Sequence, residues 1–180
     1  MRYISLLRGV NVSGQNKILM DELKSLYQSL GFENIISYIQ SGNVIFEAKE
    51  KDMKILAADI EEAIASKYGL DVSAVIRTHN DLTQIIKCCP FSHVDLEKDG
   101  SRVLVTFLVS LPSQEKLQGL VECVAAPEAL VNNGREIYLY CPNGYGKSKL
   151  SNSFIEKKLQ KVATTRNWNS ILKLHELSAG

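Results

Sequence analysis

Residues 35–46 read Ile-Ile-Ser-Tyr-Ile-Gln-Ser-Gly-Asn-Val-Ile-Phe, and this stretch largely decides the fold. The runs Ile35–Ile39 and Val44–Phe46 are rich in β-branched and aromatic residues, which are typical of strands. Between them, Ser41 and Gly42 form a pair suited to a two-residue turn, because glycine readily adopts a positive φ. The stretch therefore predicts a β-hairpin.

One strand and one helix are predicted on each side of this hairpin. Apolar residues at helical spacing predict one helix with Asp21 as its N-cap and Gly31 after its end, and a second helix that ends at Gly69. Strands are expected at Tyr3–Leu7 and Val72–Ile76. The apolar stripes are Leu23, Leu26, Tyr27 and Leu30 in the first helix, and Met53, Leu56, Ala57, Ile60 and Ile64 in the second. The order β-α-β-β-α-β is the ferredoxin-like arrangement, an antiparallel sheet with two helices on one side.

The second half predicts a related unit. A strand at Val103–Val109 precedes a helix that Ser113 caps, and a hairpin then leads through the turn 132–134 into the strand Ile137–Tyr140. After a helix over roughly 150–162, the residues beyond Thr165 predict another helix in place of a closing strand. The expected fold class is therefore α+β: two ferredoxin-like subdomains with antiparallel sheets, the second copy incomplete and ending in an extra helix.

The predicted boundaries give a ferredoxin-like subdomain over 1–78 and a related α+β subdomain over 102–180. Between them, residues 79–101 form a linker with a short helix at about Asp81–Lys87, followed by a turn-rich stretch. A chain of 180 residues with 45% hydrophobic content can bury a core in each part.

Composition excludes several classes of protein. The 21 Lys and Arg residues nearly balance the 20 Asp and Glu residues, so nucleic-acid binding through bulk charge is not expected. Arg8 interrupts the first apolar stretch, and the run Val103–Leu111 is shorter than the roughly 20 residues that span a bilayer, so we expect no signal peptide and no membrane partner. Cys88, Cys89, Cys123 and Cys141 show no metal-binding spacing, which predicts free thiols in a cytoplasmic protein without a metal or cofactor.

The first candidate site follows from the topology. In a ferredoxin-like unit, the loop after the first strand and the turn of the hairpin emerge at the same end. Their amide, hydroxyl and basic groups would suit a ligand. Alternatively, the Asn and Gly residues serve turn geometry and tie one loop to the other. The candidate residues are Arg8, Asn11, Ser13, Gln15, Asn16 and Lys17 in the loop, and Gln40, Ser41 and Asn43 in the hairpin.

The second candidate site is a glycine-rich segment that precedes a predicted helix. A helix N-terminus with nearby lysines can bind an anion, but the segment is no Walker A loop, because Cys141 stands where that motif needs glycine. The alternative is a turn with Ser148 as N-cap and two solvated lysines. From Lys147 to Lys173 there are seven basic residues and one acid, Glu156. The candidates are Gly146, Lys147, Ser148, Lys149 and Asn152, with Thr165, Arg166 and Asn167.

Four motifs resemble the DUF1697 family. They are Leu6-Leu7-Arg8-Gly9-Val10-Asn11-Val12 with Asn16-Lys17, Gln40-Ser41-Gly42-Asn43-Val44 with Phe46, Gly146-Lys147-Ser148-Lys149-Leu150 with Asn152, and Ala163-Thr164-Thr165-Arg166-Asn167-Trp168. The resemblance implies a cytosolic bacterial protein. It supplies no reaction, because the function of that family is unknown.

The residues favour one functional hypothesis and leave two alternatives. The favoured hypothesis is binding of a phosphate-bearing molecule or a nucleic acid through the polar loops and the basic segments at 144–152 and 164–167. One alternative is an enzyme that acts on a small phosphorylated or acidic substrate, with Lys147 or Arg166 stabilising charge. The other is a protein-interaction or oligomerisation module built on exposed sheet edges.

Overall fold

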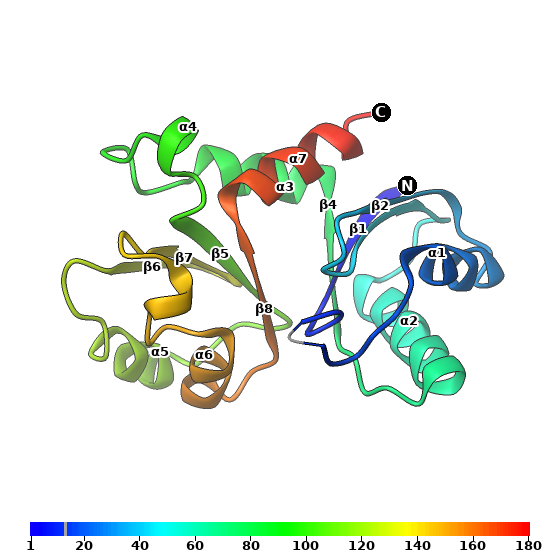
Figure 1. The fold of residues 1–180 in the computed structure, drawn as a ribbon, viewed down its shortest axis with the longest axis horizontal. Helices are drawn as coiled ribbons and strands as arrows, with labels where there is room; N and C mark the ends of the chain where they lie inside the picture. The colour runs from blue at the N-terminus through cyan, green and yellow to red at the C-terminus, as the bar shows by residue number, and fades with distance from the viewer. Residues whose placement is uncertain (13) are drawn as a thin grey trace. The chain divides into compact units, whose positions relative to one another are not determined.

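The chain forms two compact units, as seen in a computed structural model that describes residues 1–12 and 14–180. Unit 1 comprises Met1–Gln84 together with Lys173–Gly180, and unit 2 comprises Ile85–Leu172. The units therefore divide the chain inside two helices, α3 (His79–Lys87) and α7 (Trp168–Ser178), whereas the sequence predicts boundaries at residues 78 and 101. Figure 1 shows the two units, with the ribbon coloured from the N-terminus to the C-terminus.

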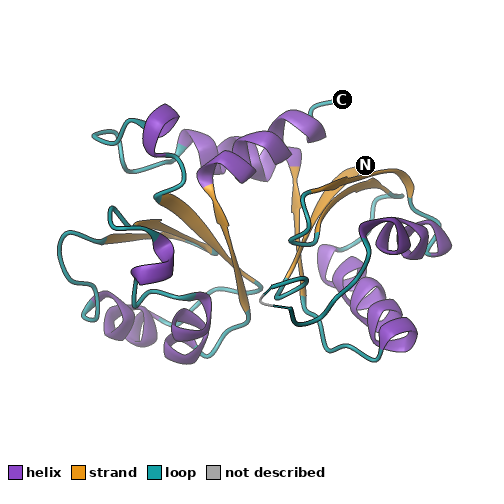
Figure 2. Ribbon diagram, in the orientation of Figure 1, coloured by secondary structure: helices purple, strands orange, loops and turns teal. Residues whose placement is uncertain are grey.

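Unit 1 is a four-stranded antiparallel sheet in the order β2-β3-β1-β4. Helices α1 and α2 lie on one face of it (Figure 2). Aromatic rings fill the space between sheet and helices; the centroids of Phe32 and Phe46 are 4.5 Å apart, and Tyr27 meets both rings edge-on. The elements are β1 (Arg2–Leu7), α1 (Met20–Ser29), β2 (Glu33–Tyr38), β3 (Asn43–Glu47), α2 (Met53–Tyr68) and β4 (Ala74–Thr78).

Unit 2 is also a four-stranded antiparallel sheet, in the order β6-β7-β5-β8. The prediction of two ferredoxin-like units is thus confirmed, but the expectation that the second copy is incomplete is wrong, because β8 closes its sheet against β5. The elements are α4 (Leu96–Asp99), β5 (Val103–Leu108), α5 (Gln114–Val121), β6 (Ala129–Asn133), β7 (Glu136–Tyr140), the 3₁₀ turn η1 (Tyr145–Lys147), α6 (Asn152–Leu159) and β8 (Ala163–Asn167).

The sequence pattern did not predict β8, the closing strand, because this strand is polar. Its residues read Ala-Thr-Thr-Arg-Asn, without the alternation of apolar and polar residues that marks a half-buried strand. The polar groups find partners inside the unit: the Thr165 hydroxyl lies 2.8 Å from that of Thr106 and donates to Asn152 Oδ1 at 2.9 Å. Satisfied hydrogen bonds thus permit a polar strand beside the central strand.

The two closing strands are anchored in the same way. At the start of β4 the Ala74 amide donates to Glu61 Oε1 at 2.7 Å, and at the start of β8 the Ala163 amide donates to Glu156 Oε1 at 2.9 Å. Each strand also carries a buried arginine at the fourth position, Arg77 in β4 and Arg166 in β8. Burial lowers the pKa of Arg166 to about 10. The internal repeat therefore extends from strand order to individual side-chain contacts.

The hairpin turn of unit 1 is longer than predicted. It runs from Ile39 to Gly42, and both of these residues have positive φ, 52° and 71°. A Cβ added at Gly42 would lie 2.8 Å from the Cβ of Leu7 and 3.2 Å from that of Val10. The turn therefore needs glycine at this position for two reasons, its backbone conformation and its contact with the end of β1.

We expect Gly42→Ala to lower the free energy of unfolding by about 2–4 kcal/mol, since it combines a strained φ with overpacking. Gly31→Ala is the matched control, because Gly31 has a φ of 78° but no atom within 4 Å of an added Cβ. That variant should lose about 1 kcal/mol. Urea denaturation measures both, and equal losses would contradict the packing argument.

Two histidines join the start of α3 to the end of α7 within unit 1. The rings of His79 and His175 stack with centroids 4.2 Å apart and an angle of 21° between their planes. His79 Nδ1 lies 3.0 Å from the Ser178 hydroxyl, and His175 Nε2 lies 2.9 Å from the Thr83 hydroxyl. Burial, and to a smaller extent the nearby His79, lower the pKa of His175.

This depressed pKa predicts a pH dependence of stability. Because the folded protein holds the proton on His175 less tightly than the unfolded chain does, the free energy of unfolding should decrease as pH falls through about 6.5. His175→Gln should remove part of that decrease, whereas His93→Gln, at an exposed residue, should not. Urea denaturation at pH 7.5 and pH 5.5 tests this, and identical pH dependence in all three proteins would refute it.

Candidate functional site

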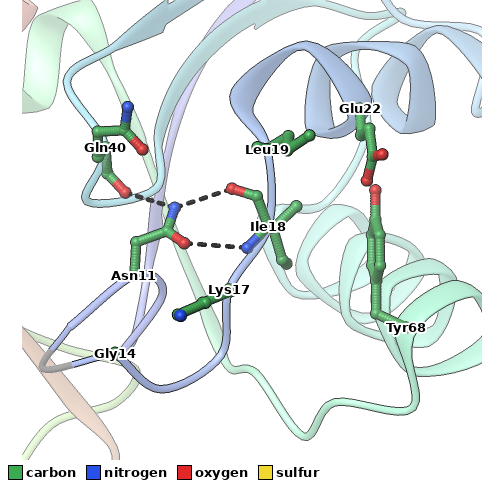
Figure 3. A pocket seen from close by; sticks show the side chains of 8 residues that line it. All are labelled: Asn11, Gly14, Lys17, Ile18, Leu19, Glu22, Gln40 and Tyr68. Carbon is green, nitrogen blue, oxygen red and sulfur yellow. Dashed lines mark hydrogen bonds between the residues drawn. The ribbon is translucent and has the colours of Figure 1, made fainter.

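A cavity of about 350 Å³ lies where the loop after β1 meets the hairpin turn in unit 1. The antiparallel topology predicts this meeting, because the loop and the turn emerge at one end of the sheet. The N-terminal end of α1 and the C-terminal end of α2 complete the wall (Figure 3). The lining residues are Asn11, Gly14, Lys17, Ile18, Leu19, Glu22, Gln40 and Tyr68.

Asn11 ties the loop to the turn. Its Nδ2 donates to the Gln40 carbonyl at 2.8 Å and to the Ile18 carbonyl at 2.9 Å, and its Oδ1 accepts from the Ile18 amide at 2.9 Å (Figure 3). The contact predicted between loop and hairpin is thus confirmed. Because these bonds occupy both polar atoms of the amide, and because φ of Asn11 is 56°, the residue serves mainly to shape the loop.

The other asparagines of this candidate site also bond within the protein. Asn16 Nδ2 donates to the Gly9 carbonyl at 3.2 Å, and the Asn16 carbonyl accepts from the Asn11 amide. Asn43 is buried, and its Nδ2 donates to the Tyr38 carbonyl at 3.1 Å and to the Ser41 hydroxyl at 2.9 Å. Arg8 and Ser41 make further contacts inside the protein. Ser13 lies outside the described residues.

Two polar residues of the cavity were missed by sequence analysis, Glu22 and Tyr68. The sequence gives no sign that either residue belongs to a site. Glu22 is an acid in the first turn of a helix, where acids are common, and Tyr68 is the last residue of α2 before Gly69. In the structure the Tyr68 hydroxyl is buried without a hydrogen-bond partner. In Figure 3 the Glu22 carboxylate and the Tyr68 hydroxyl point toward one another.

The N-terminal end of α1 is open at the same place. The helix begins at Met20 with Leu19 in the N-cap position, and no side chain caps it. The prediction of Asp21 as N-cap is therefore wrong, because Asp21 already lies in the first turn. An uncapped helix end leaves backbone amides without intrahelical partners and carries partial positive charge, which Asp21 and Glu22 in the first turn of α1 offset.

The glycine-rich segment of unit 2 differs from its prediction. The helix does not begin near Lys147 but at Asn152, and Ser151 caps it by accepting from the Phe154 amide. The amides of Lys147 and Ser148 donate to carbonyls of the 3₁₀ turn, at 3.1 and 3.0 Å, and the Leu150 amide donates to the Ser148 hydroxyl at 2.9 Å. These amides are therefore not free for an anion. Gly146, Lys147 and Lys149 are exposed.

The remaining candidates of unit 2 point into the unit. Asn152 Nδ2 donates to the Ala163 carbonyl at 2.8 Å, while its Oδ1 accepts from Thr165. Arg166 is only 8% exposed, and its guanidinium donates to the Thr164 hydroxyl at 2.7 Å. Asn167 Oδ1 accepts from the Ser170 amide in the first turn of α7. These contacts attach α6 and α7 to the closing strand.

The described part of the chain holds neither a cluster of metal-ligating side chains nor a membrane-spanning helix. In residues 1–12 and 14–180, no group of three or more His, Cys, Asp and Glu residues is placed to hold a metal ion. Within the same described residues, no helix combines the length and apolar character needed to cross a bilayer.

The four cysteines are free thiols, and burial raises the pKa of Cys89 and of Cys141.

We expect Asn11→Ala to lower the free energy of unfolding by about 2–4 kcal/mol, because it leaves buried loop groups unpaired and places alanine at a positive φ. Gln15→Ala, at an exposed residue of the same loop, should change it by less than about 0.5 kcal/mol. Thermal and urea denaturation measure both variants. A neutral Asn11→Ala would show that Asn11 does not hold the loop.

Comparisons with known proteins agree with this architecture. The solved structure of a conserved bacterial protein from Streptococcus pneumoniae resembles this chain with a TM-score of 0.76 and 24% sequence identity, over 98% of each chain. That likeness shows a shared fold. The comparison with curated proteins gave no match. A family model described as a protein of unknown function, DUF1697, matches residues 1–138, which include the first two of the four motifs. The chain therefore belongs to the DUF1697 family.

Proposed function

We propose that the protein binds a small molecule with a phosphate or carboxylate group in the cavity of unit 1. The observation that carries the proposal is the combination of a cavity of about 350 Å³, partly open to solvent, with polar groups that have no partner within the protein, above all the Tyr68 hydroxyl. Native proteins rarely bury a hydroxyl without a partner, and such groups often mark ligand sites. The cavity volume is near the lower end of the range for small-molecule sites, roughly 300–1,000 Å³.

The preference for an anionic group rests on charge. Lys17 is the basic residue of the lining, and Figure 3 shows it at the other side of the cavity from Glu22, the acid of the lining. At the start of α1, Asp21 and Glu22 offset the partial positive charge of the helix, so the preference rests on Lys17. Unlike Asn11, Lys17 forms no ion pair or hydrogen bond within the part of the chain that the structure describes. An ammonium group at the rim of a cavity can attract a phosphate or carboxylate without any loss of internal contacts.

A small ligand fits these observations better than a nucleic acid does. The cavity is too small for several nucleotides. Two of the seven basic residues from Lys147 to Lys173 also make contacts within the protein. Arg166 is buried, and Lys173 pairs with Glu176 at 2.8 Å. The four cysteines are free thiols, which are typical of proteins in the reducing cytoplasm, so we also propose that the protein acts there.

Lys17→Ala should weaken binding of an anionic ligand about tenfold while leaving the melting temperature nearly unchanged, because the side chain is exposed. A thermal-shift screen of small phosphates and carboxylates at low salt identifies ligands, and calorimetric titration then compares wild type with Lys17→Ala. Lys54→Ala, an exposed lysine outside the cavity lining, is the control.

Salt separates the two kinds of partner. Binding through one phosphate should depend weakly on salt, whereas an oligonucleotide contacting several lysines would lose affinity steeply. Equal affinity of wild type and Lys17→Ala, or binding of oligonucleotides alone, would contradict the proposal.

A further inference from the structure

We infer that the ligand of this cavity carries a hydroxyl group, which lies between Glu22 and Tyr68. The inference rests on the proposed function and specifies it further: the ligand is a hydroxylated phosphate or carboxylate of the polyol or hydroxy-acid class. Two observations lead to it. The Tyr68 hydroxyl is buried without a hydrogen-bond partner, and the Glu22 carboxylate points toward it (Figure 3).

Tyr68 is held firmly at this place. It is the last residue of α2, and Gly69 ends the helix in the left-handed conformation while its amide donates to the Ala65 carbonyl at 2.8 Å. The ammonium group of Lys67 lies 5.2 Å from the centroid of the Tyr68 ring. The hydroxyl is covered in this structure, so a ligand group reaches it only when a neighbouring side chain moves aside, and the exposed side chain of Glu22 is free to do so.

The cavity has two polar ends. Figure 3 shows Glu22 and Tyr68 at one side, and Asn11, Gln40 and Lys17 at the other. The apolar side chains of Ile18 and Leu19 also line the wall. A ligand that fills the space therefore meets a basic group at one end, apolar surface along its length, and a carboxylate with a hydroxyl at the other end.

The two polar groups at the Glu22 and Tyr68 end of the cavity favour a ligand hydroxyl. A ligand hydroxyl can accept from the Tyr68 O–H and donate to the Glu22 carboxylate at the same time. An ammonium group can donate to Glu22 and to the Tyr68 oxygen, but it leaves the Tyr68 O–H without an acceptor. A second phosphate or carboxylate could accept from Tyr68 but would be repelled by Glu22. Water satisfies the same two groups and is the competing occupant.

Two pairs of ligands test the inference by calorimetric titration: glycerol 3-phosphate against propyl phosphate, and glycerate against propionate. Each pair shares its anionic group and differs in hydroxyls. Wild type should bind the hydroxylated member of at least one pair about tenfold or more tightly, as expected for a hydrogen bond to a charged group. Tyr68→Phe should bring that ratio close to one, and Glu22→Gln, which keeps an acceptor oxygen but loses the charge, should lower it, while the affinity of Tyr68→Phe for the deoxy member stays within about twofold.

The free protein provides a second measurement. Because the Tyr68 hydroxyl has no partner, Tyr68→Phe should leave the melting temperature of the free protein unchanged or raise it. A lowered melting temperature together with an unchanged binding ratio would overturn the inference, since the hydroxyl would then be structural.

Other outcomes separate this inference from the proposed function. Equal binding of both members in each pair, with weakening by Lys17→Ala, would overturn the hydroxyl site alone and assign that position to water. No binding of any of the four ligands would overturn the proposed function and the inference with it.

Discussion

The antiparallel pairing of β1 with β3 is the constraint on which most of unit 1 depends. It sets Leu6 opposite Asn43, so the loop that leaves β1 and the turn that enters β3 emerge at one end of the sheet. The Leu7 amide reinforces this arrangement by donating to the Gly42 carbonyl at 2.9 Å. The cavity exists because this pairing brings two loops together at the open end of α1.

Unit 2 applies the same constraint without the same result. There β5 pairs with β7, and the Leu108 amide donates to the Arg135 carbonyl at 2.8 Å, as Leu7 does to Gly42 in unit 1. Yet the hairpin of unit 2 is short, with only Gly134 and Arg135 between β6 and β7. The same strand order therefore supports different loops, and function depends on those loops rather than on the fold.

The polar residues of the loops fall into two classes with different physical roles. The side chains of Asn11, Asn16 and Asn43 form hydrogen bonds with backbone groups of the loops. Those of Lys17 and Tyr68 form no such hydrogen bonds within the described residues. A sequence presents both classes as similar polar letters. Their separation depends on which carbonyls and amides lie within about 3 Å, and that depends on tertiary structure.

The sequence by itself determined the order of strands and helices in unit 1, because apolar spacing, Gly69 and the hairpin signal are local properties of the chain. It also indicated the end of the sheet where the cavity lies. Only the tertiary structure decided that β8 closes the second sheet, because Thr165 and Arg166 find their partners on other segments. Likewise, Glu22 and Tyr68 are 46 positions apart in the sequence and face one another only when α1 and α2 pack on the same sheet.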